Sequence, residues 1–319
     1  MKPERGKIDV YAVKAASYGQ ESAKAVRRLL EWIDVPISPG DKVLVKPNLL
    51  RADVLTCTNA AVIAETCAFL LDKGCKVTIG DSPGFGTAKG VGKAIGLDAA
   101  LLDRLGKGAS DVPIITLDSP VSKPLSLGGR VGLSRYALEA DHIMNLPKLK
   151  AHAQMRVTAS VKNLFGCVSG VRKAFLHARY GDKTQSGAAV FPSAVVDILG
   201  HLPRVTSLID GIEAMHVRGP SGGKPYPAHL LAISESPVAL DTALYAILGV
   251  APEEIPVWKE LLRREIYGAH PDHIAMCGED AGQFDLTEFK LPRTLMPETF
   301  NPARLVQSMV KRLWARFRI

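Results

Sequence analysis

The segment from residue 41 to residue 81, DKVLVKPNLLRADVLTCTNAAVIAETCAFLLDKGCKVTIGD, decides the fold. It begins with the short β-branched run DKVLVKP and ends with a second such run, CKVTIGD. Between them, NAAVIAETCAFLLDKG repeats apolar residues at helical spacing and ends on Gly74, as is typical of a helix terminus. A strand, a helix and a second strand in this order predict a β-α-β unit with parallel strands.

The remaining chain continues this alternation of strands and helices. Further strands are predicted at 8–15, 112–118, 142–147, 205–210 and 229–235. Further helices are predicted at 21–33, 188–200, 237–248 and 256–265. We therefore expect an α/β fold with a mostly parallel sheet and helices on both faces. Two arrangements stay open for residues 1–290, either one undivided domain or two α/β lobes at about 1–140 and 141–290, followed by a basic amphipathic tail at 291–319.

Composition narrows the class of protein. With 319 residues, 47% of them hydrophobic, the chain can bury a substantial core. The sequence contains no run of about 18 apolar residues and does not begin with the apolar stretch of a secretory signal, so we expect a cytoplasmic protein. Its five scattered cysteines show neither a C-x-x-C pair nor the spacing of a zinc or iron-sulfur site. We expect reduced thiols and no iron-sulfur cluster.

The net charge of +8 is concentrated in two places. Residues 145–185 carry eight Lys or Arg residues against the single acid Asp182, and residues 302–319 carry five basic residues and no acid. Such concentration favours anionic targets over a general role in solubility. Nucleic acid is not the expected target, because aromatic residues make up only 6% of the chain and no stacking motif is present.

The run NLPKLKAHAQMRVTASVKNLFG, residues 145–166, places basic groups among apolar ones and contains no carboxylate. We expect a strand to end at Pro147 and a helix to run from Ala151 to Phe165. On that helix Thr158 and Lys162 would share one face, a turn apart. Several unbalanced basic groups beside an apolar surface need compensation by solvent or by a bound anion.

Ligands of open α/β sheets gather at the carboxyl ends of the strands, and polar residues recur there in this sequence. Turn formation alone also explains single Asp, Asn and Gly residues at such positions. We expect the polar groups to line one basic cleft. The catalytic candidates are His152 as a proton shuttle, Lys162 and Asp81. The substrate-binding candidates are Lys46, Asn48, Ser82, Lys148, Lys150, Thr158, Asn163 and Asp210.

Six motifs, VLVKPNLL, VTIGDSPG, MNLPKLKAH, TASVKNLFG, DGIEAM and SPVALD, together resemble the prokaryotic family known as domain of unknown function 362. The resemblance runs from about residue 40 to about residue 280. Many members of that family carry a ferredoxin-like domain with two tetranuclear iron-sulfur clusters, whose cysteine pattern this sequence lacks. The chain also departs from the family after DGIEAM, where His216-Val217-Arg218 replaces a typical Glu-Gly-Asn. A more distant resemblance to the nickel-cofactor lactate racemases is an analogy of fold.

Two classes of function stay open. In the first, the protein is an enzyme of unassigned reaction, isomerase-like or redox-linked, acting on a small carboxylated or phosphorylated metabolite. Lys148, Lys150 and Lys162 would clamp the anion, and Asp81 or Asp210 would orient the substrate or a metal. In the second, it is a noncatalytic protein that binds or delivers an anionic cofactor such as a flavin or deazaflavin. The cofactor is open between a metal and a flavin-like group, although the histidines lack metal-ligand spacing.

The tail NPARLVQSMVKRLWARFRI, residues 301–319, repeats apolar residues at helical spacing and borders them with basic ones. We expect such a helix to dock on its own domain or on a second subunit of a homodimer. The alternative is that it lies on an anionic membrane surface, which would make a cytoplasmic protein peripheral to the membrane.

Overall fold

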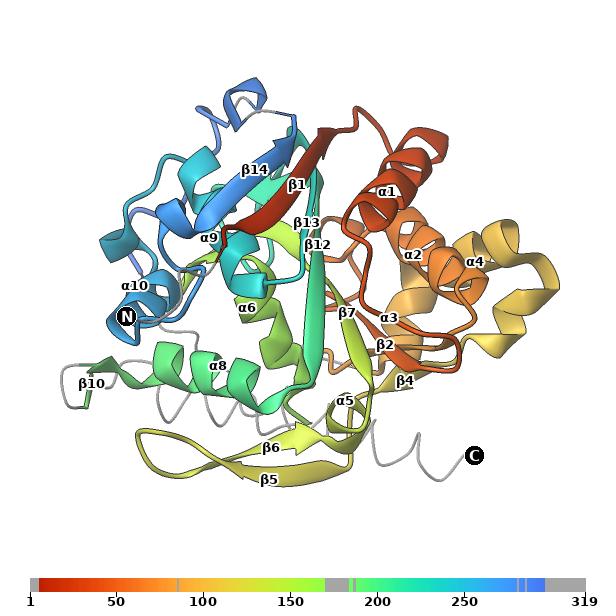
Figure 1. Ribbon diagram of the computed structural model, residues 1–319, viewed down its shortest axis with the longest axis horizontal. Coiled ribbons are helices and arrows are strands. Elements are labelled where there is room, and N and C mark those ends of the chain that lie inside the picture. Colours follow the sequence, from red (N-terminus) through yellow and green to blue (C-terminus); the bar gives the residue numbers. More distant parts are fainter. Residues whose placement is uncertain are drawn as a thin grey trace.

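The β-α-β unit predicted from residues 41–81 is present in the computed structural model (Figure 1). Its elements are β2 (Lys42–Pro47), α2 (Ala60–Asp72) and β3 (Lys76–Asp81), and the two strands pair in parallel. Asn59 begins α2, because its side chain accepts a hydrogen bond from the backbone N–H of Ala61. The structure describes residues 6–84, 86–169, 184–185, 188–279, 281–284 and 286–295.

Ten strands form the main sheet, in the order β14-β1-β13-β12-β7-β2-β3-β4, with β8 beside β12 and β9 beside β8. Pairing is parallel except at β1–β13, β13–β12 and β8–β9, so the expected mostly parallel sheet is confirmed. Besides β2 and β3 its strands are β1 (Ile8–Lys14), β4 (Ile114–Thr116), β7 (His142–Leu146), β8 (Lys148–His152), β9 (Arg156–Thr158), β12 (Arg204–His216), β13 (Lys224–Ser234) and β14 (Ile274–Gly278). Two short pairs lie outside it, β5 (Pro120–Pro124) with β6 (Arg130–Ser134) and β10 (Thr184–Gln185) with β11 (Ala188–Ala189).

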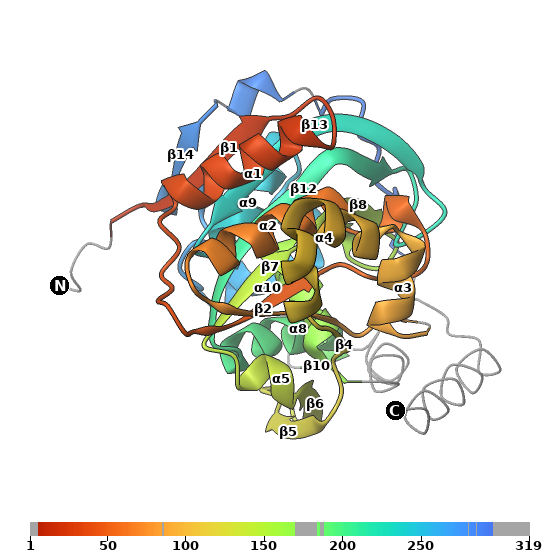
Figure 2. The same cartoon turned by 90° about the vertical axis from the view of Figure 1, so that its right-hand side faces the viewer.

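Helices cover both faces of the sheet, as expected (Figures 1 and 2). On one face lie α1 (Gln20–Trp32), α2, α3 (Ala88–Ala94) and α4 (Leu97–Leu105). On the other lie α6 (Ser160–Asn163), α8 (Val190–His201), α9 (Pro237–Ile247) and α10 (Pro256–Arg263), and the short α5 (Arg135–Leu138) follows β6. Successive strand residues therefore enter different cores: Leu208 packs with α1 and α2, whereas Ile209 packs with α9.

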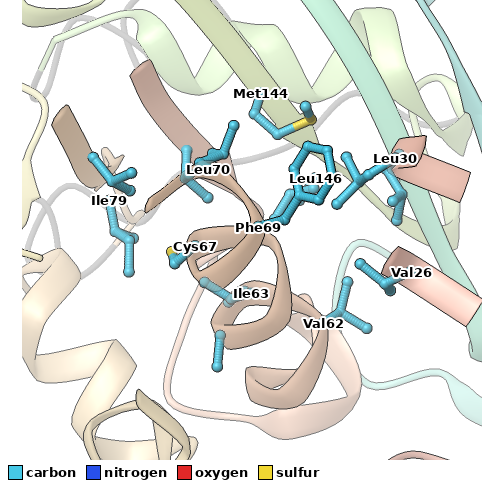
Figure 3. Packing of buried hydrophobic residues seen from close by; sticks show 14 of the residues in the cluster. Val26, Leu30, Val62, Ile63, Cys67, Phe69, Leu70, Ile79, Met144 and Leu146 are labelled. Carbon is cyan, nitrogen blue, oxygen red and sulfur yellow. The ribbon is translucent and has the colours of Figure 1, made fainter. Parts of the chain in front are cut away.

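Helix α2 lies at the centre of the larger core (Figure 3). Val62, Ile63, Cys67, Phe69 and Leu70 all point into that core and are 3% exposed or less. A helix that is apolar on most sides must be buried on most sides, and the sheet, α1 and α4 together provide that cover. This packing fixes the end of β2, and with it the loop that leads into α2.

The helix or helix-like segment expected from Ala151 to Phe165 is wrong for residues 151–159, and the chain is helical only from Ser160 onward, in α6 and the 3-10 helix Leu164–Cys167 that follows it. The chain instead continues as β8, turns, and returns as β9 before the single helical turn of α6. The sequence pattern explains the strand, because Lys148, Lys150 and His152 alternate with the apolar Leu149 and Ala151. A repeat of two residues is the spacing of a β-strand. The strand expected to stop at Pro147 does end at Leu146. The basic tail expected at 291–319 lies, from residue 296 onward, outside the described residues.

Candidate functional site

Lys46 and Asp81 form a buried ion pair at the carboxyl ends of β2 and β3. The Nζ atom of Lys46 lies 2.8 Å from Oδ1 of Asp81 and donates a second bond, of 2.8 Å, to the carbonyl oxygen of Pro47. Asp81 also accepts from the backbone N–H of Leu49 and of Ser82, at 2.7 and 2.8 Å. The group that Asp81 binds in the structure is therefore the protein's own Lys46.

Gly166 makes room for this pair. A Cβ atom added at residue 166 would lie 2.5 Å from Oδ1 of Asp81 and closer still to the end of the Lys46 side chain. No real Cβ contact is that short, so any side chain at this position displaces the ion pair. The last residue of the motif TASVKNLFG is thus a packing requirement of the site.

Lys148 forms a second buried pair, with Asp210 of β12, at 3.0 Å. The hydroxyl of Tyr18 joins the two groups: it accepts from Lys148 Nζ at 2.6 Å and donates to Oδ1 of Asp210 at 2.7 Å. The backbone N–H of Asn59 donates to the other carboxylate oxygen at 2.8 Å. Burial, together with the charge of Asp210, raises the pKa of Tyr18 far above its usual value, so the phenol keeps its proton.

Lys150, two residues further along β8, reaches the loop between β2 and α2. Its Nζ atom donates to Oδ1 of Asn48 at 3.1 Å and to the carbonyl oxygen of Thr56 at 2.8 Å. The hydroxyl of Thr58 accepts from the backbone N–H of Asn48 and donates to the carbonyl oxygen of Leu146. The loop is thus attached to β7 and β8 by several buried hydrogen bonds.

The same loop is fixed at both of its ends by the two aspartates. Leu49 donates to Asp81 near its beginning, and Asn59 donates to Asp210 where α2 starts. Asp81 and Asp210 therefore each neutralise a lysine and hold one end of the segment from Asn48 to Asn59. Strand ends, lysines and loop form one hydrogen-bonded unit.

Asn163 connects α6 to the site. Its side-chain amide donates to the carbonyl oxygen of Lys46 at 3.3 Å and to Oδ1 of Asn145 at 2.8 Å. Asn145 in turn donates to the hydroxyl of Ser207 and to the carbonyl oxygen of Ser160. The candidates Lys46, Asn48, Asp81, Lys148, Lys150, Asn163 and Asp210 thus meet at one edge of the sheet, with Ser82 next to Asp81.

His152 contacts backbone groups of the turn that follows it, and Lys162 contacts two phenylalanine rings. Nδ1 of His152 accepts from the backbone N–H groups of Gln154 and Met155, at 3.1 and 3.2 Å. The ring proton is therefore assigned to Nε2, which suits a hydrogen-bond donor better than a base. The ammonium of Lys162 lies 4.5 Å from the ring centre of Phe165 and 5.6 Å from that of Phe191, on the side of α8.

Asp241 of α9 holds α6 in place. Its two oxygens accept from the backbone N–H groups of Ser160 and Val161, at 2.6 and 2.9 Å, at the start of α6. Tyr245 also bonds to this carboxyl group. Complete burial nevertheless raises the pKa of Asp241 to about 7, against the opposing effect of these hydrogen bonds.

The sequence predictions missed Tyr18, Asn59, Gly166 and the role of Asp241. Tyr18 could have been predicted from the sequence. Strand β1 runs in the same direction as β12, β7 and β2, and Tyr18 follows the carboxyl end of β1. The rule that selected Lys46 and Asp81 also applies to that loop. Asp241 had no such signal, because its partners are backbone groups about 80 residues away.

Metal-ligating and thiol groups contribute little within the described residues. No three His, Cys, Asp or Glu side chains gather there in an arrangement suited to a metal ion. The five cysteines, all within the described residues, form no disulfide, and all except Cys277 are buried. Burial raises the pKa of the Cys57 thiol, which lies in the site loop and donates to the carbonyl oxygen of Arg51. A reactive thiolate is therefore disfavoured at Cys57.

The fold and this edge define an α/β protein with a buried lysine–aspartate site at the carboxyl ends of its strands. Residues 43–246 match the family described as a domain of unknown function (DUF362), and the chain belongs to that family. The predicted family resemblance is confirmed. A thylakoid-associated protein of Synechocystis sp. is 35% identical over 287 residues, which are 88% of this chain and 85% of that protein.

Two solved structures show a remote likeness. They are a protein of Thermotoga maritima, with a TM-score of 0.42, and the lactate racemase apoprotein of Thermoanaerobacterium thermosaccharolyticum, with a TM-score of 0.40. Both are 13% identical to this chain and match 70% and 64% of it, respectively. The chain spans 57% of the first structure and 51% of the second.

Replacing Gly166 by alanine should destabilise the protein by about 1–3 kcal/mol, because the added methyl group must separate Lys46 from Asp81 or shift the backbone. Gly200→Ala is the matched control, since nothing lies within 4 Å of a Cβ there and alanine is the better helix former. Urea denaturation of both variants measures the difference. Equal stability of Gly166→Ala and the wild type would contradict the contact.

Asp241 should make stability fall as pH rises from about 4 to about 7. Its pKa is about 7 in the folded protein against an ordinary value of 3.8, so in this window the folded state binds more protons than the unfolded state. Asp241→Asn removes that titration. The free energy of unfolding of the variant should therefore increase relative to that of the wild type as the pH rises from 4.5 to 7.5. The exposed Asp98→Asn is the control. A relative loss over the same interval would reverse the assignment.

Proposed function

We propose that the protein is an enzyme acting on a small metabolite that carries a carboxylate or phosphate, bound at the carboxyl edge of the sheet. The observation that carries this proposal is the convergence of Lys46, Lys148 and Lys150, each 2% exposed or less, at that edge. Buried ion pairs contribute little net stability compared with apolar packing, because removing charges from water is unfavourable. Clusters of this kind are more typical of functional sites than of structural cores.

The buried pair of Lys148 and Asp210 is suited to proton transfer. The hydroxyl of Tyr18 bridges the ammonium of Lys148 and the carboxylate of Asp210, so a proton moved at one group can be balanced at another. Lys150 presents a third positive charge two residues away on the same face of β8. These features support acid–base chemistry on an anion, and an isomerase-like reaction fits them more directly than a redox-linked one.

Lys150→Met tests the anion site. We expect phosphate esters or small carboxylates to raise the melting temperature of the wild-type protein, and the variant to lose this shift because the charge that meets the anion is gone. Lys24→Met, at an exposed lysine of α1, is the control and should respond as the wild type does. An unchanged response of Lys150→Met, with its fold checked by circular dichroism, would exclude Lys150 from binding.

Catalysis is tested with the anions that bind. Proton NMR in heavy water would follow exchange of carbon-bound hydrogens, which a proton-transferring enzyme catalyses. Tyr18→Phe should slow this exchange more than it weakens binding, since it removes the bridging hydroxyl and keeps the ring. Binding with no exchange and no product would instead favour the alternative role as a binding or delivery protein for an anionic cofactor such as a flavin or deazaflavin.

A peripheral membrane location is a second proposal, and it concerns the tail. The described residues contain no helix long and apolar enough to cross a bilayer. The sequence of the tail nevertheless combines five basic residues with Trp314 and Phe317, a composition suited to an anionic lipid surface. The relative from Synechocystis sp. is described as thylakoid-associated. These two observations favour surface binding over the expected docking on the domain or on a second subunit.

Cosedimentation with anionic vesicles tests this location. The full chain should sediment with the vesicles, less so at high salt, and a form cut after Glu298 should stay in the supernatant. Equal sedimentation of both forms would remove the tail from any membrane role. A truncated form that changes its oligomeric state would instead support docking between subunits.

A further inference from the structure

Thr158 is a buried polar residue whose side chain lacks a hydrogen bond. It ends β9, is 3% exposed, and its Oγ1 atom has no hydrogen-bond partner among the residues that the structure describes. A hydroxyl buried without a partner is unfavourable, and such groups call for an explanation. The neighbouring hydroxyl of Thr56, by contrast, donates to the carbonyl oxygen of Asp53.

The register of the sheet places this hydroxyl beside Lys150. In the antiparallel pair of β8 and β9, Lys150 lies directly opposite Thr158, so both side chains leave the same face of the ribbon. Val157 and Ala159, on either side of Thr158, point to the other face and join the apolar cluster around α9. The face shared by Thr158 and Lys150 is the face that meets the site loop, since Lys150 bonds there to Asn48 and Thr56.

The chemistry of the two groups defines what would bind beside them. The Thr158 hydroxyl has a donor that no acceptor among the described residues takes up, and the Lys150 ammonium next to it carries a positive charge. A free hydroxyl donor beside a positive charge matches a negatively charged oxygen, which forms stronger hydrogen bonds than a neutral one. A carboxylate or phosphate group supplies such an oxygen.

We propose that Thr158 and Lys150 form an oxyanion subsite in which the threonine hydroxyl donates to a carboxylate or phosphate oxygen of the ligand. This inference rests on the proposed function and adds the group that recognises the anionic oxygen. It also separates two kinds of residue in the site, because Lys46 and Lys148 are neutralised within the protein, whereas Thr158 gains its partner only from the ligand.

The first test needs no ligand. Thr158→Val keeps the shape of the side chain and removes only the hydroxyl, so the variant should melt at the same temperature as the wild type or a higher one. Thr242→Val is the matched control, because its hydroxyl on α9 is also buried and without a hydrogen-bond partner. A fall of several degrees for Thr158→Val would show that the hydroxyl is already bonded in the resting protein, and would overturn the proposal.

The second test measures binding of inorganic phosphate and of succinate by calorimetry, at constant ionic strength set with chloride. Thr158→Val should weaken the better of the two probes at least tenfold, Thr158→Ser should restore most of the affinity, and Thr242→Val should bind as the wild type does. Equal affinity of Thr158→Val and the wild type would overturn the subsite alone. Failure of the wild type to bind either probe would instead count against the proposed anion site as a whole.

Discussion

The burial of lysine ammonium groups is the constraint on which this edge of the protein depends. Lys46 and Lys148 are almost fully enclosed, and each meets a carboxylate from another strand. Removing either member of such a pair leaves a buried charge alone, which typically costs about 3–5 kcal/mol. The pairs therefore also constrain the order of the strands. Asp81 reaches its lysine only because β3 lies next to β2, and Asp210 reaches its lysine only because β12 lies on the other side of β7.

The same two carboxylates carry the loop that closes the site. Asp81 accepts the backbone N–H group of Leu49 at Oδ2, the oxygen that does not pair with Lys46. Asp210 accepts the backbone N–H group of Asn59 at the same oxygen, Oδ2, that pairs with Lys148. A loop held in this way at both ends is positioned by the charges as well as by the packing of its own buried Leu49 and Cys57. Its middle is held differently, by the bond from Lys150 to the neutral carbonyl oxygen of Thr56. The charged groups that form the ion pairs therefore also determine the conformation of the loop.

Sequence patterns predicted the β-α-β unit, the mostly parallel sheet and the convergence of Lys46, Asp81, Lys148 and Asp210 at one edge, because strand period and strand direction are local or nearly local properties. They did not predict which charges pair, since partners 35 and 62 residues apart become neighbours only through the order of the strands. The false helix over 151–165 had a different origin. The alternating residues Lys148, Lys150 and His152, which lie just before and at its start, were interpreted as part of an unbalanced basic surface, although a strand presents such residues on one face and Leu149 on the other.

That correction changes the meaning of the basic stretch at 145–166. Its lack of carboxylates predicted that solvent or a bound anion would compensate the charge, yet for Lys148 the anion is Asp210, supplied by the same chain. Basic charge in a sequence is therefore weak evidence for a ligand until strand order shows which acids reach it. What remains informative is the polar group that the fold buries and leaves unbonded, because packing gives no reason to keep it. Thr242 shares the unbonded hydroxyl, so what supports the proposed oxyanion subsite is the combination at Thr158 of such a hydroxyl with Lys150 directly opposite it in the sheet.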